Sequence, residues 1–240
     1  MRFPPDLLRG KLLRRYKRFL ADIALDDGRE VTAHCANPGS MLAVAIEGAP
    51  VWVSENNDPK RKLKFSWELI DLNGTLLPIN TNNPNKIAFE AISAGVIPEL
   101  TGYETIRREV KYGENSRIDL LLEGGRRAKK HRGPAYVEIK NVHLVREPGL
   151  AEFPDSVTKR GAKHMDELAR IAASGGHAVI LFIVQRGDCH RLRPAADLDP
   201  DYATALKNAV ATGVNPLVYD CEVTTSEVVL RKPLELDLDS

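Results

Sequence analysis

The sequence predicts an α/β protein in two parts, with a small all-β unit over residues 1–82 and an α/β domain over residues 83–240. Two observations predict this division. Short strand-like runs separated by turn signals fill the first part. In the second part helical patterns alternate with strand patterns, and residues 178–184 form an almost wholly apolar run, typical of a central strand buried on both faces.

The all-β unit is predicted from five expected strands and the turns between them. Asp26, Asp27 and Gly28 form a hairpin turn, and Asn73 followed by Gly74 is a strong two-residue hairpin signal. The strands are expected at residues 19–25, 30–35, 50–54, 64–72 and 75–79. Five short strands in one unit are compatible with an OB-fold, a five-stranded β-barrel that often binds single-stranded nucleic acid or oligosaccharide.

The second part is expected to run in the order helix, three strands, helix, strand, helix and two strands. Its first helix begins at Asn83 and Pro84, because proline is favoured in the first turn, and ends near residue 94. Its second helix begins after Pro154, with Asp155 or Ser156 as its cap. The other elements are expected at residues 103–111, 117–123, 135–144, 178–184, 200–212 (a helix), 216–223 and 226–231.

Composition indicates a soluble globular protein. Hydrophobic residues make up 43% of the 240 residues, which is enough for a packed core. No run approaches the length of a membrane span, and the N-terminus lacks the apolar core of a secretory signal. Cys35, Cys189 and Cys221 show neither zinc-site nor disulfide spacing, so a reducing cytoplasm is expected, with each thiol as a small core residue.

Basic residues gather near the N-terminus although the net charge of the chain is only +1. Residues 1–18 hold seven basic side chains and one acid, and such a local patch can bind a phosphate backbone. Two further basic clusters lie at residues 60–64, where a solvated loop is the simpler interpretation, and at residues 126–132. The residues expected to bind nucleic acid are Arg14, Arg15, Tyr16, Lys17 and Arg18 near the N-terminus, with Arg160 and Lys163 as phosphate clamps on the second helix.

Aromatic residues and a helix accompany these basic residues. Tyr16 and Phe19 lie among the N-terminal cations, and either base stacking or a place in the core explains them. The second helix is expected to bury an apolar stripe formed by Val157, Met165, Leu168 and Ala172. Its other side is basic and contains Lys159, Arg160, Lys163 and His164.

Three charged residues stand in two otherwise apolar strands and predict a metal site. Side chains alternate along a strand, so Glu138 and Lys140 share one face while Ile139 points into the core. If the strand carrying Asp119 pairs with this one, cross-strand neighbours lie about 5 Å apart and two carboxylates can share a cation. Hard oxygen ligands suit Mg²⁺ or Mn²⁺, and the lysine can hold a phosphate oxygen or activate water.

A structural interpretation of the same residues stays open. A Glu-x-Lys pair on a strand is also a common surface ion pair, and Glu109 with Lys111 is a second example in this chain. Glu138 differs because its neighbours are apolar, and a buried unpaired charge costs several kcal/mol. Glu90 is the one acid of the first helix, and it either faces solvent or joins the metal site.

Longer motifs resemble those of a known family. The arrangement of Asp119 on the second strand and Glu138-x-Lys140 on the third resembles the core of the PD-(D/E)xK nuclease superfamily, although Ile118 stands where the superfamily has proline. Over nearly the whole chain the sequence resembles the sugar fermentation stimulation protein A family. The matching stretches are residues 14–19 (RRYKRF), 34–41 (HCANPGSM), 138–142 (EIKNV), 153–158 (FPDSVT) and 160–164 (RGAKH).

The resemblance implies an N-terminal OB-fold joined to a restriction-endonuclease-like α/β domain, in a DNA-binding protein linked to sugar (maltose) utilisation. By matching position, Asp119, Glu138 and Lys140 become the nuclease acids and lysine, with Glu90 as the helix carboxylate.

Two functions follow as expectations. The first is a magnesium- or manganese-dependent nuclease on DNA or RNA, in which Asp119 and Glu138 hold the metal. The second is a sequence-tolerant DNA-binding regulator of sugar metabolism without turnover. A carbohydrate-binding module would need exposed tryptophans, whereas Trp52 and Trp67 are expected in strands of the core. The sequence leaves open whether the chain acts alone or as a homodimer.

Overall fold

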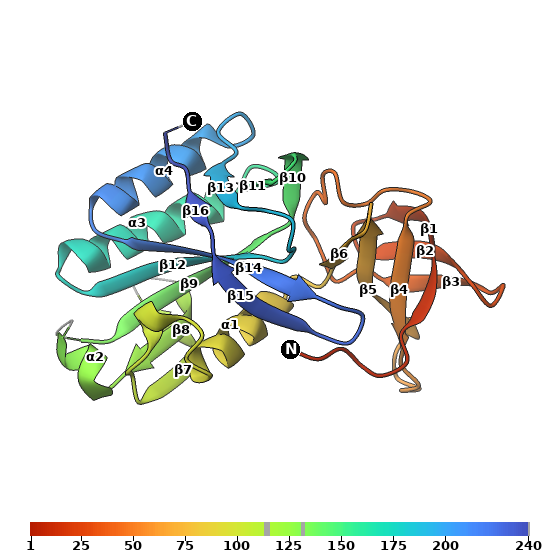
Figure 1. Cartoon of the computed structure of the whole chain (residues 1–240), viewed down its shortest axis with the longest axis horizontal. Coiled ribbons are helices and arrows are strands. Elements are labelled where there is room, and N and C mark those ends of the chain that lie inside the picture. The colour runs from red at the N-terminus through yellow and green to blue at the C-terminus, as the bar shows by residue number, and fades with distance from the viewer. Residues whose placement is uncertain (113–115, 131–132, 240) are drawn as a thin grey trace.

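The computed structural model describes residues 1–112, 116–130 and 133–239, and its two parts lie side by side (Figure 1). A β-barrel formed by the N-terminal third of the chain lies at the right of the view. An α/β domain lies at the left, with α3 (Lys159–Ala173) and α4 (Pro200–Ala211) on one side of its large sheet and α1 (Asn83–Ser93) on the other. In the described part of the chain no helix is both long and apolar enough to cross a membrane.

The barrel is a closed ring of five strands, which confirms the expected OB-fold. The strands follow the order β3-β2-β1-β4-β5, and a parallel pairing of β3 with β5 closes the ring. Alternating residues such as Ile23, Val51 and Trp67 fill its interior. The bounds are β1 (Leu8–Tyr16), β2 (Leu20–Leu25), β3 (Glu30–His34), β4 (Pro50–Glu55) and β5 (Phe65–Leu72), and β6 (Thr75–Pro78) pairs with β5 outside the ring.

The strand β1 is not among the five strands that the sequence predicts. The predicted barrel begins at residue 19 and takes residues 75–79 as its fifth strand. Outward-facing cations such as Lys11 and Arg14 hide the inward alternation of β1, in which Gly10 and Leu12 are buried. A Cβ atom at Gly10 would lie 2.5 Å from the carbonyl oxygen of Ala24, so glycine permits the close approach of β1 to β2.

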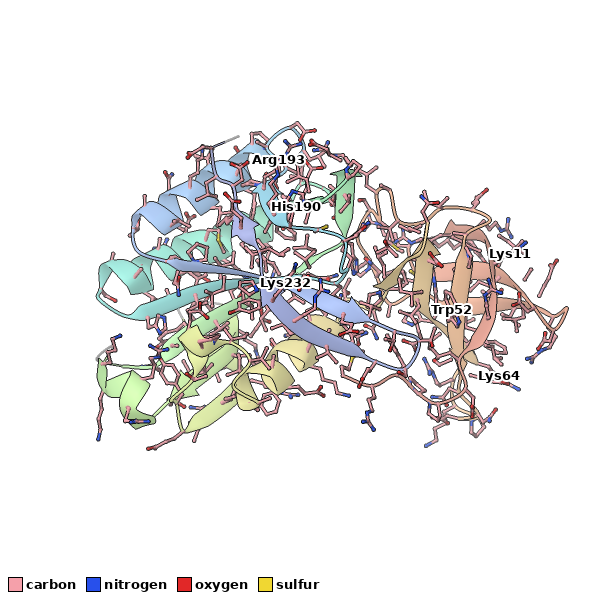
Figure 2. The ribbon with its side chains drawn as sticks, in the orientation of Figure 1. Lys11, Trp52, Lys64, His190, Arg193 and Lys232 are labelled. Atoms are coloured by element: carbon pink, nitrogen blue, oxygen red, sulfur yellow. The ribbon has the colours of Figure 1, made fainter. Side chains whose placement is uncertain are left out.

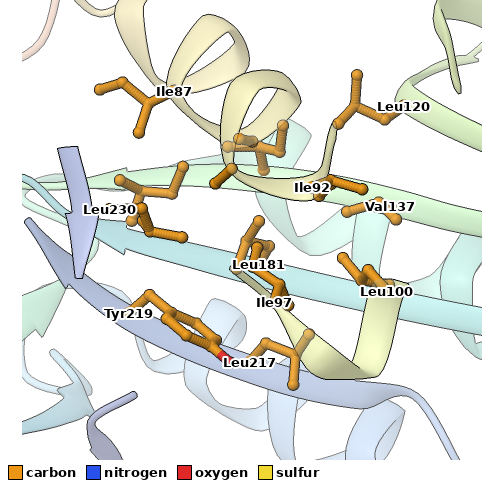
Figure 3. Packing of buried hydrophobic residues seen from close by; sticks show 14 of the residues in the cluster. Ile87, Ile92, Ile97, Leu100, Leu120, Val137, Leu181, Leu217, Tyr219 and Leu230 are labelled. Atoms are coloured by element: carbon orange, nitrogen blue, oxygen red, sulfur yellow. The ribbon is translucent and has the colours of Figure 1, made fainter. Parts of the chain in front are cut away.

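The α/β domain is built on a mixed six-stranded sheet in the order β15-β14-β12-β9-β8-β7. Its central strand β12 is buried along its whole length, as the apolar run predicts. Figure 3 shows Ile87 and Ile92 of α1 packed toward Val137 and Leu181 of the sheet. Each such side chain contributes about 1.5–3 kcal/mol when fully buried. The bounds are β7 (Thr105–Tyr112), β8 (Ser116–Glu123), β9 (Ala135–Val142), β12 (His177–Val184), β14 (Asn215–Val223) and β15 (Val228–Pro233).

The helix α3 begins later than the sequence predicts. Its N-cap is Thr158, whose hydroxyl accepts a hydrogen bond from the backbone N–H of Gly161, and neither Asp155 nor Ser156 caps it. Val157 consequently lies outside the helix and is exposed, although the predicted apolar stripe includes it.

Two short helices and a small second sheet complete the domain. The basic cluster expected in a loop at residues 126–132 lies partly in α2 (Gly125–Lys130), and residues 131 and 132 fall outside the described residues. A 3₁₀ helix, η1 (Pro98–Leu100), follows α1. The second sheet, absent from the sequence expectation, contains β10 (Leu144–Glu147), β11 (Leu150–Phe153), β13 (Arg191–Pro194) and β16 (Glu235–Leu236).

The barrel and the α/β domain are joined by apolar and polar contacts. Leu69 of β5 belongs to the same buried cluster as the α1 side of the large sheet. The Thr75 hydroxyl donates to Asp188 at 3.2 Å. Asp155 accepts hydrogen bonds from the Ser40 hydroxyl at 3.0 Å and from the Met41 N–H at 3.1 Å. The bonds to Asp155 hold the barrel loop at residues 37–41 against the second domain.

Arg15 fixes the same loop from the barrel side. Its Nη2 donates to the backbone carbonyl oxygens of Arg18 at 3.1 Å, Asn37 at 2.9 Å and Gly39 at 2.8 Å, and its Nη1 donates to that of Ser40 at 3.3 Å. One guanidinium therefore satisfies four carbonyl groups. This arrangement gives Arg15 a structural role, whereas the sequence places it on the nucleic-acid-binding surface.

We expect Arg15→Ala to lower the free energy of unfolding by about 1–3 kcal/mol, because partly buried carbonyl groups lose a charged donor. Urea unfolding followed by circular dichroism measures the change. Arg18→Ala is the matched control, since that side chain is exposed, and its effect should stay within about 0.5 kcal/mol. Equal stability of the two variants would contradict the structural role of Arg15.

Candidate active site

The two predicted carboxylates meet where β8 and β9 separate. The strands pair antiparallel at three residue pairs, and the last of these is Leu120 with Val137. The next pair in this register is Asp119 with Glu138, but the ladder ends before it. Instead, the Asp119 Oδ2 atom accepts a hydrogen bond from the backbone N–H of Ile139 at 2.7 Å. The strand ends thus open into a pocket lined by both carboxylates.

Glu138 and Lys140 share one face of β9, as strand alternation predicts, and Ile139 packs into the core on the other face. The Lys140 Nζ atom donates to Glu138 Oε1 at 2.8 Å. His164 of α3 also donates from Nδ1 to Glu138 Oε1. Glu138 is only 3% exposed, so its charge depends on these two partners.

The hydrogen bonds around His164 indicate which ring nitrogen carries the proton. Arg160 donates from Nε to His164 Nε2 at 3.3 Å, which requires a lone pair on Nε2. The proton of a neutral imidazole then lies on Nδ1 and is donated to Glu138. His164 thereby orients the Glu138 carboxylate, and it is buried, although the sequence groups it with the basic residues opposite the apolar stripe of the helix.

The environments of the two carboxylates move their pKa values in opposite directions. Burial and, to a smaller extent, the negative charge of Glu138 raise the pKa of Asp119 to about 6, although hydrogen bonds from Ile139 and Asn85 oppose the shift. Burial also opposes ionisation of Glu138, but the hydrogen bond from His164 and the charge of Lys140 outweigh it and lower the pKa of Glu138. Pairs of acids whose pKa values diverge in this way are typical of functional sites.

One oxygen of Glu138 is left without a partner. Its Oε2 atom is buried and accepts no hydrogen bond from the described residues. A buried carboxylate oxygen in this state costs free energy unless a ligand or a cation binds it. Asp119 and Glu138 offer hard oxygen donors, so this site fits a divalent cation of the Mg²⁺ type. The described residues contain no group of three or more His, Cys, Asp and Glu side chains arranged to hold a metal.

The pocket has a volume of about 400 Å³, and both domains form its walls. Asn37, Pro38 and Gly39 contribute from the barrel loop, while Arg117 of β8 and Arg160 of α3 contribute from the α/β domain. Because this loop is held by Arg15 and Asp155, the barrel takes part in shaping the site.

Glu90 does not belong to this pocket, so the prediction of a helix carboxylate at the site is wrong. Glu90 forms an ion pair with the N-terminal amine of Met1 at 2.7 Å and lines a different cavity, against β15. The physical reason is that α1 packs on the opposite face of the sheet from α3, toward which Glu138 projects. The first turn of α1 contributes Asn85 instead, which donates to Asp119 Oδ1 at 2.9 Å.

The residues predicted to bind nucleic acid divide into two groups. Arg14 pairs with Asp22 at 2.8 Å, and the Tyr16 hydroxyl donates to the same carboxylate at 3.1 Å, so both have partners within the barrel, as Arg15 does. Lys163 pairs with Glu167 at 3.9 Å and does not line the pocket. Lys17 and Arg18 are exposed and form no ion pair within the described part of the chain, and Arg160 lines the pocket.

Other basic residues of the barrel lie away from the pocket. Figure 2 shows Lys11 and Lys64 on the side of the barrel that faces away from the α/β domain. This position agrees with the interpretation of residues 60–64 as a charged, solvated loop.

Four residues of the site are not predicted from the sequence. His164 and Asn85 hydrogen-bond to the two carboxylates, and Arg117 lines the pocket. Glu109 lies opposite Asp119 where the pairing of β7 and β8 is interrupted, and it has a φ of 54°. The Asn85 Nδ2 atom also donates a hydrogen bond to Glu109 Oε1 at 3.4 Å. A positive φ outside glycine is a form of strain that concentrates at functional sites, but no sequence signal predicts it at Glu109.

Asp119 gives a testable pH dependence of stability. The pKa of Asp119 in the folded state, about 6, lies above its ordinary value of 3.8. The folded protein therefore binds the proton of this carboxyl more tightly than the unfolded chain does. The stability gained in this way is fully present below about pH 4 and is lost as the pH rises through about 6. We expect the free energy of unfolding of the metal-free protein to fall over this range relative to that of Asp119→Asn, which cannot ionise. Urea unfolding in EDTA between pH 4 and 8 measures the difference.

Asp166→Asn, which removes an exposed acid of α3, is the control for loss of a charge. A difference between the wild type and Asp119→Asn that does not change with pH would contradict the raised pKa.

Comparison with known proteins agrees with this two-part architecture. The model of the SfsA N-terminal OB domain matches residues 13–79, and that of the Sugar fermentation stimulation protein RE domain matches residues 82–227. The structure of Pyrococcus furiosus SfsA in complex with Ca²⁺ is similar, with a TM-score of 0.85 and 28% identity, over 99% of this chain and 98% of that one.

Curated relatives match over nearly their whole length. The sugar fermentation stimulation protein homolog of Maricaulis maris is 56% identical over 99% of both chains. The homolog of Rhodospirillum centenum is 53% identical over 98% of this chain and 99% of its own, and that of Ruegeria pomeroyi is 54% identical over 98% and 100%. The chain therefore belongs to the sugar fermentation stimulation protein (SfsA) family.

Proposed function

We propose that this protein is a metal-dependent phosphodiesterase that cleaves nucleic acid in the pocket of Asp119 and Glu138. The observation that carries the proposal is the buried, unpartnered Oε2 atom of Glu138, beside a second carboxylate with a raised pKa. A bound cation would satisfy this oxygen, and unlike the buried Oε2 atom of Glu167 it belongs to a carboxylate that lines the pocket.

Asp119 and Glu138 would hold the divalent cation, Mg²⁺ or Mn²⁺. When bound, such a cation supplies Lewis-acid polarisation of a phosphate ester. The Ca²⁺ complex of the Pyrococcus furiosus relative supports the choice of a hard, oxygen-preferring ion. The hydrogen bonds from Ile139 and His164 fix the orientation of the two carboxylates before any ligand binds.

The cationic side chains of the pocket have separate roles in this proposal. Lys140 donates to Glu138 and is partly exposed to the pocket, so its ammonium can orient the attacking water or contact a phosphate oxygen. Arg160 and Arg117 line the pocket at other points, where they can hold the phosphates on either side. The exposed cations Lys17 and Arg18 add attraction for a polyanion.

One observation favours the second candidate, a DNA-binding regulator of sugar metabolism that does not cleave. Lys140 and His164 already donate hydrogen bonds to Glu138, and the described residues contain no group of three or more His, Cys, Asp and Glu side chains that could hold a metal ion. The relatives' names, which refer to sugar fermentation, agree with such a role.

We expect Asp119→Asn and Glu138→Gln each to reduce Mg²⁺- or Mn²⁺-dependent cleavage of DNA or RNA by at least about 100-fold, the scale on which loss of one electrostatic group acts. Binding of the same nucleic acid should persist, because neither substitution removes a cation. Cleavage assays, calorimetric Mn²⁺ titration and fluorescence anisotropy measure the three properties.

Glu90→Gln is the matched control, since it removes a carboxylate outside the pocket and should leave cleavage unchanged. Wild-type protein that binds nucleic acid but cleaves neither strand type with either metal would favour the regulator. Full cleavage by Asp119→Asn would refute the assigned site.

A further inference from the structure

We infer that the ligand of this site is a single-stranded nucleic acid, which runs from the pocket over the barrel loop at residues 37–39 to an exposed aromatic and basic hairpin tip. The hairpin tip consists of Lys17, Arg18 and Phe19, between β1 and β2. This inference rests on the proposed function for the position of the reacting phosphate, and it adds the form of nucleic acid that the site accepts.

The shape of the pocket favours one strand. Its volume of about 400 Å³ lies at the small end of the range for single small-molecule ligands, and Glu138 at its base is only 3% exposed. In a duplex, stacked base pairs hold the backbone on the outside of a wide cylinder. If a duplex had to unstack locally to place a phosphate against the buried carboxylate, this would cost a few kcal/mol. A single strand has the required freedom without this cost.

The hairpin tip has the features that bind single strands elsewhere. Phe19 is 48% exposed, so the structure places it outside the core. Lys17 and Arg18 both have left-handed backbone conformations, with φ of 50° and 64°. Among the described residues neither cation pairs with a carboxylate. An aromatic ring flanked by free cations can stack on a base while the cations contact the adjoining phosphates.

Hydrogen bonds join this hairpin tip to the pocket wall. The Arg15 guanidinium bridges the carbonyl oxygen of Arg18 to those of Asn37 and Gly39, at distances between 2.8 and 3.1 Å. The backbone N–H of Cys35 donates to the Phe19 carbonyl oxygen at 2.7 Å. The hairpin tip and the loop are therefore held in a fixed relation, which reduces the loss of conformational freedom on binding.

The pocket also carries cations. Lys140 and Arg160 line it together with Asn37 and Gly39 of the loop. The pocket is lined as well by five carboxylates, those of Glu109, Asp119, Glu138, Glu152 and Asp155, so a phosphate would need the bound divalent cation there. A chain of several phosphates would reach both the pocket and the cations of the hairpin tip, whereas a lone mononucleotide would occupy only the pocket.

The test compares binding of matched 12-nucleotide single strands, of DNA and of RNA, with a 12-base-pair duplex, to the full-length protein in EDTA. We expect fluorescence anisotropy to show at least about tenfold tighter binding of the single strands. Phe19→Ala should weaken single-strand binding by about tenfold, which corresponds to about 1.4 kcal/mol. Phe19→Tyr should restore it, because the aromatic face remains.

Ile46→Ala is the matched control, because Ile46 is an apolar barrel residue with nearly the same exposure, 49%. The double variant Lys17→Asn and Arg18→Asn tests the charge, since asparagine tolerates left-handed backbone. It should reduce the slope of log K against log salt by about 1.4, that is, about 0.7 for each lost phosphate contact on a single strand. Circular dichroism checks that every variant is folded.

The outcomes separate this inference from the proposed function. Single-strand preference that depends on Phe19, without any cleavage in Mg²⁺ or Mn²⁺, would support the inference and refute the nuclease. Cleavage of duplex in preference to single strands would support the nuclease and overturn the inference. Equal affinity for the two forms, or unchanged affinity in Phe19→Ala, would also overturn it.

Discussion

The site depends on one hydrogen bond, from the backbone N–H of Ile139 to the carboxylate of Asp119. The pairing of β8 and β9 stops after Leu120 and Val137. The bond to Asp119 takes the place of the next backbone hydrogen bond between the two strands. A side chain thus replaces a backbone carbonyl as the acceptor, and the strand ends separate without leaving the donor unpaired. The opening that results exposes the polar face of β9 to the pocket, and Glu138 and Lys140 lie on that face.

The fold sustains this arrangement because the sheet is covered on both sides. The α1 side and the α3–α4 side each have a continuous apolar cluster, and these supply the stability that buried charges reduce. The charges themselves are partly compensated: Lys140 and His164 hold one oxygen of Glu138, and Asn85 holds one oxygen of Asp119. Of the four oxygen atoms of these two carboxylates, Glu138 Oε2 is the one that lacks a partner among the described residues.

Much of the fold follows from local sequence patterns. The apolar run of β12 and the turn at Asn73 and Gly74 are local signals, and the common face of Glu138 and Lys140 follows from the period of a strand. The strand β1 is missed because its outward residues are basic, so that the run resembles a charged patch.

Features that depend on packing could not be predicted in this way. The sequence cannot specify which face of the sheet α1 covers. The prediction therefore places Glu90 at the site, where it does not lie, and omits Asn85, which hydrogen-bonds to Asp119. His164 stands among lysines and arginines in the chain, and only the docking of α3 against β9 shows that it is buried. The wall at residues 37–39 arises from contact between the two domains, which has no local signal.

The first residues of the chain are attached to the last part of the fold. The Phe3 N–H donates to the carbonyl oxygen of Ser226, and the Val228 N–H donates to that of Met1, so the chain passes from the α/β domain into the barrel and back again. During synthesis the barrel can close as soon as β5 has left the ribosome, since all its ring contacts lie within about 70 residues. The backbone partners of the segment before it, Ser226 and Val228, emerge only near the end of synthesis. Its docking is therefore a late step of folding, and it joins the barrel to the finished sheet at a second point.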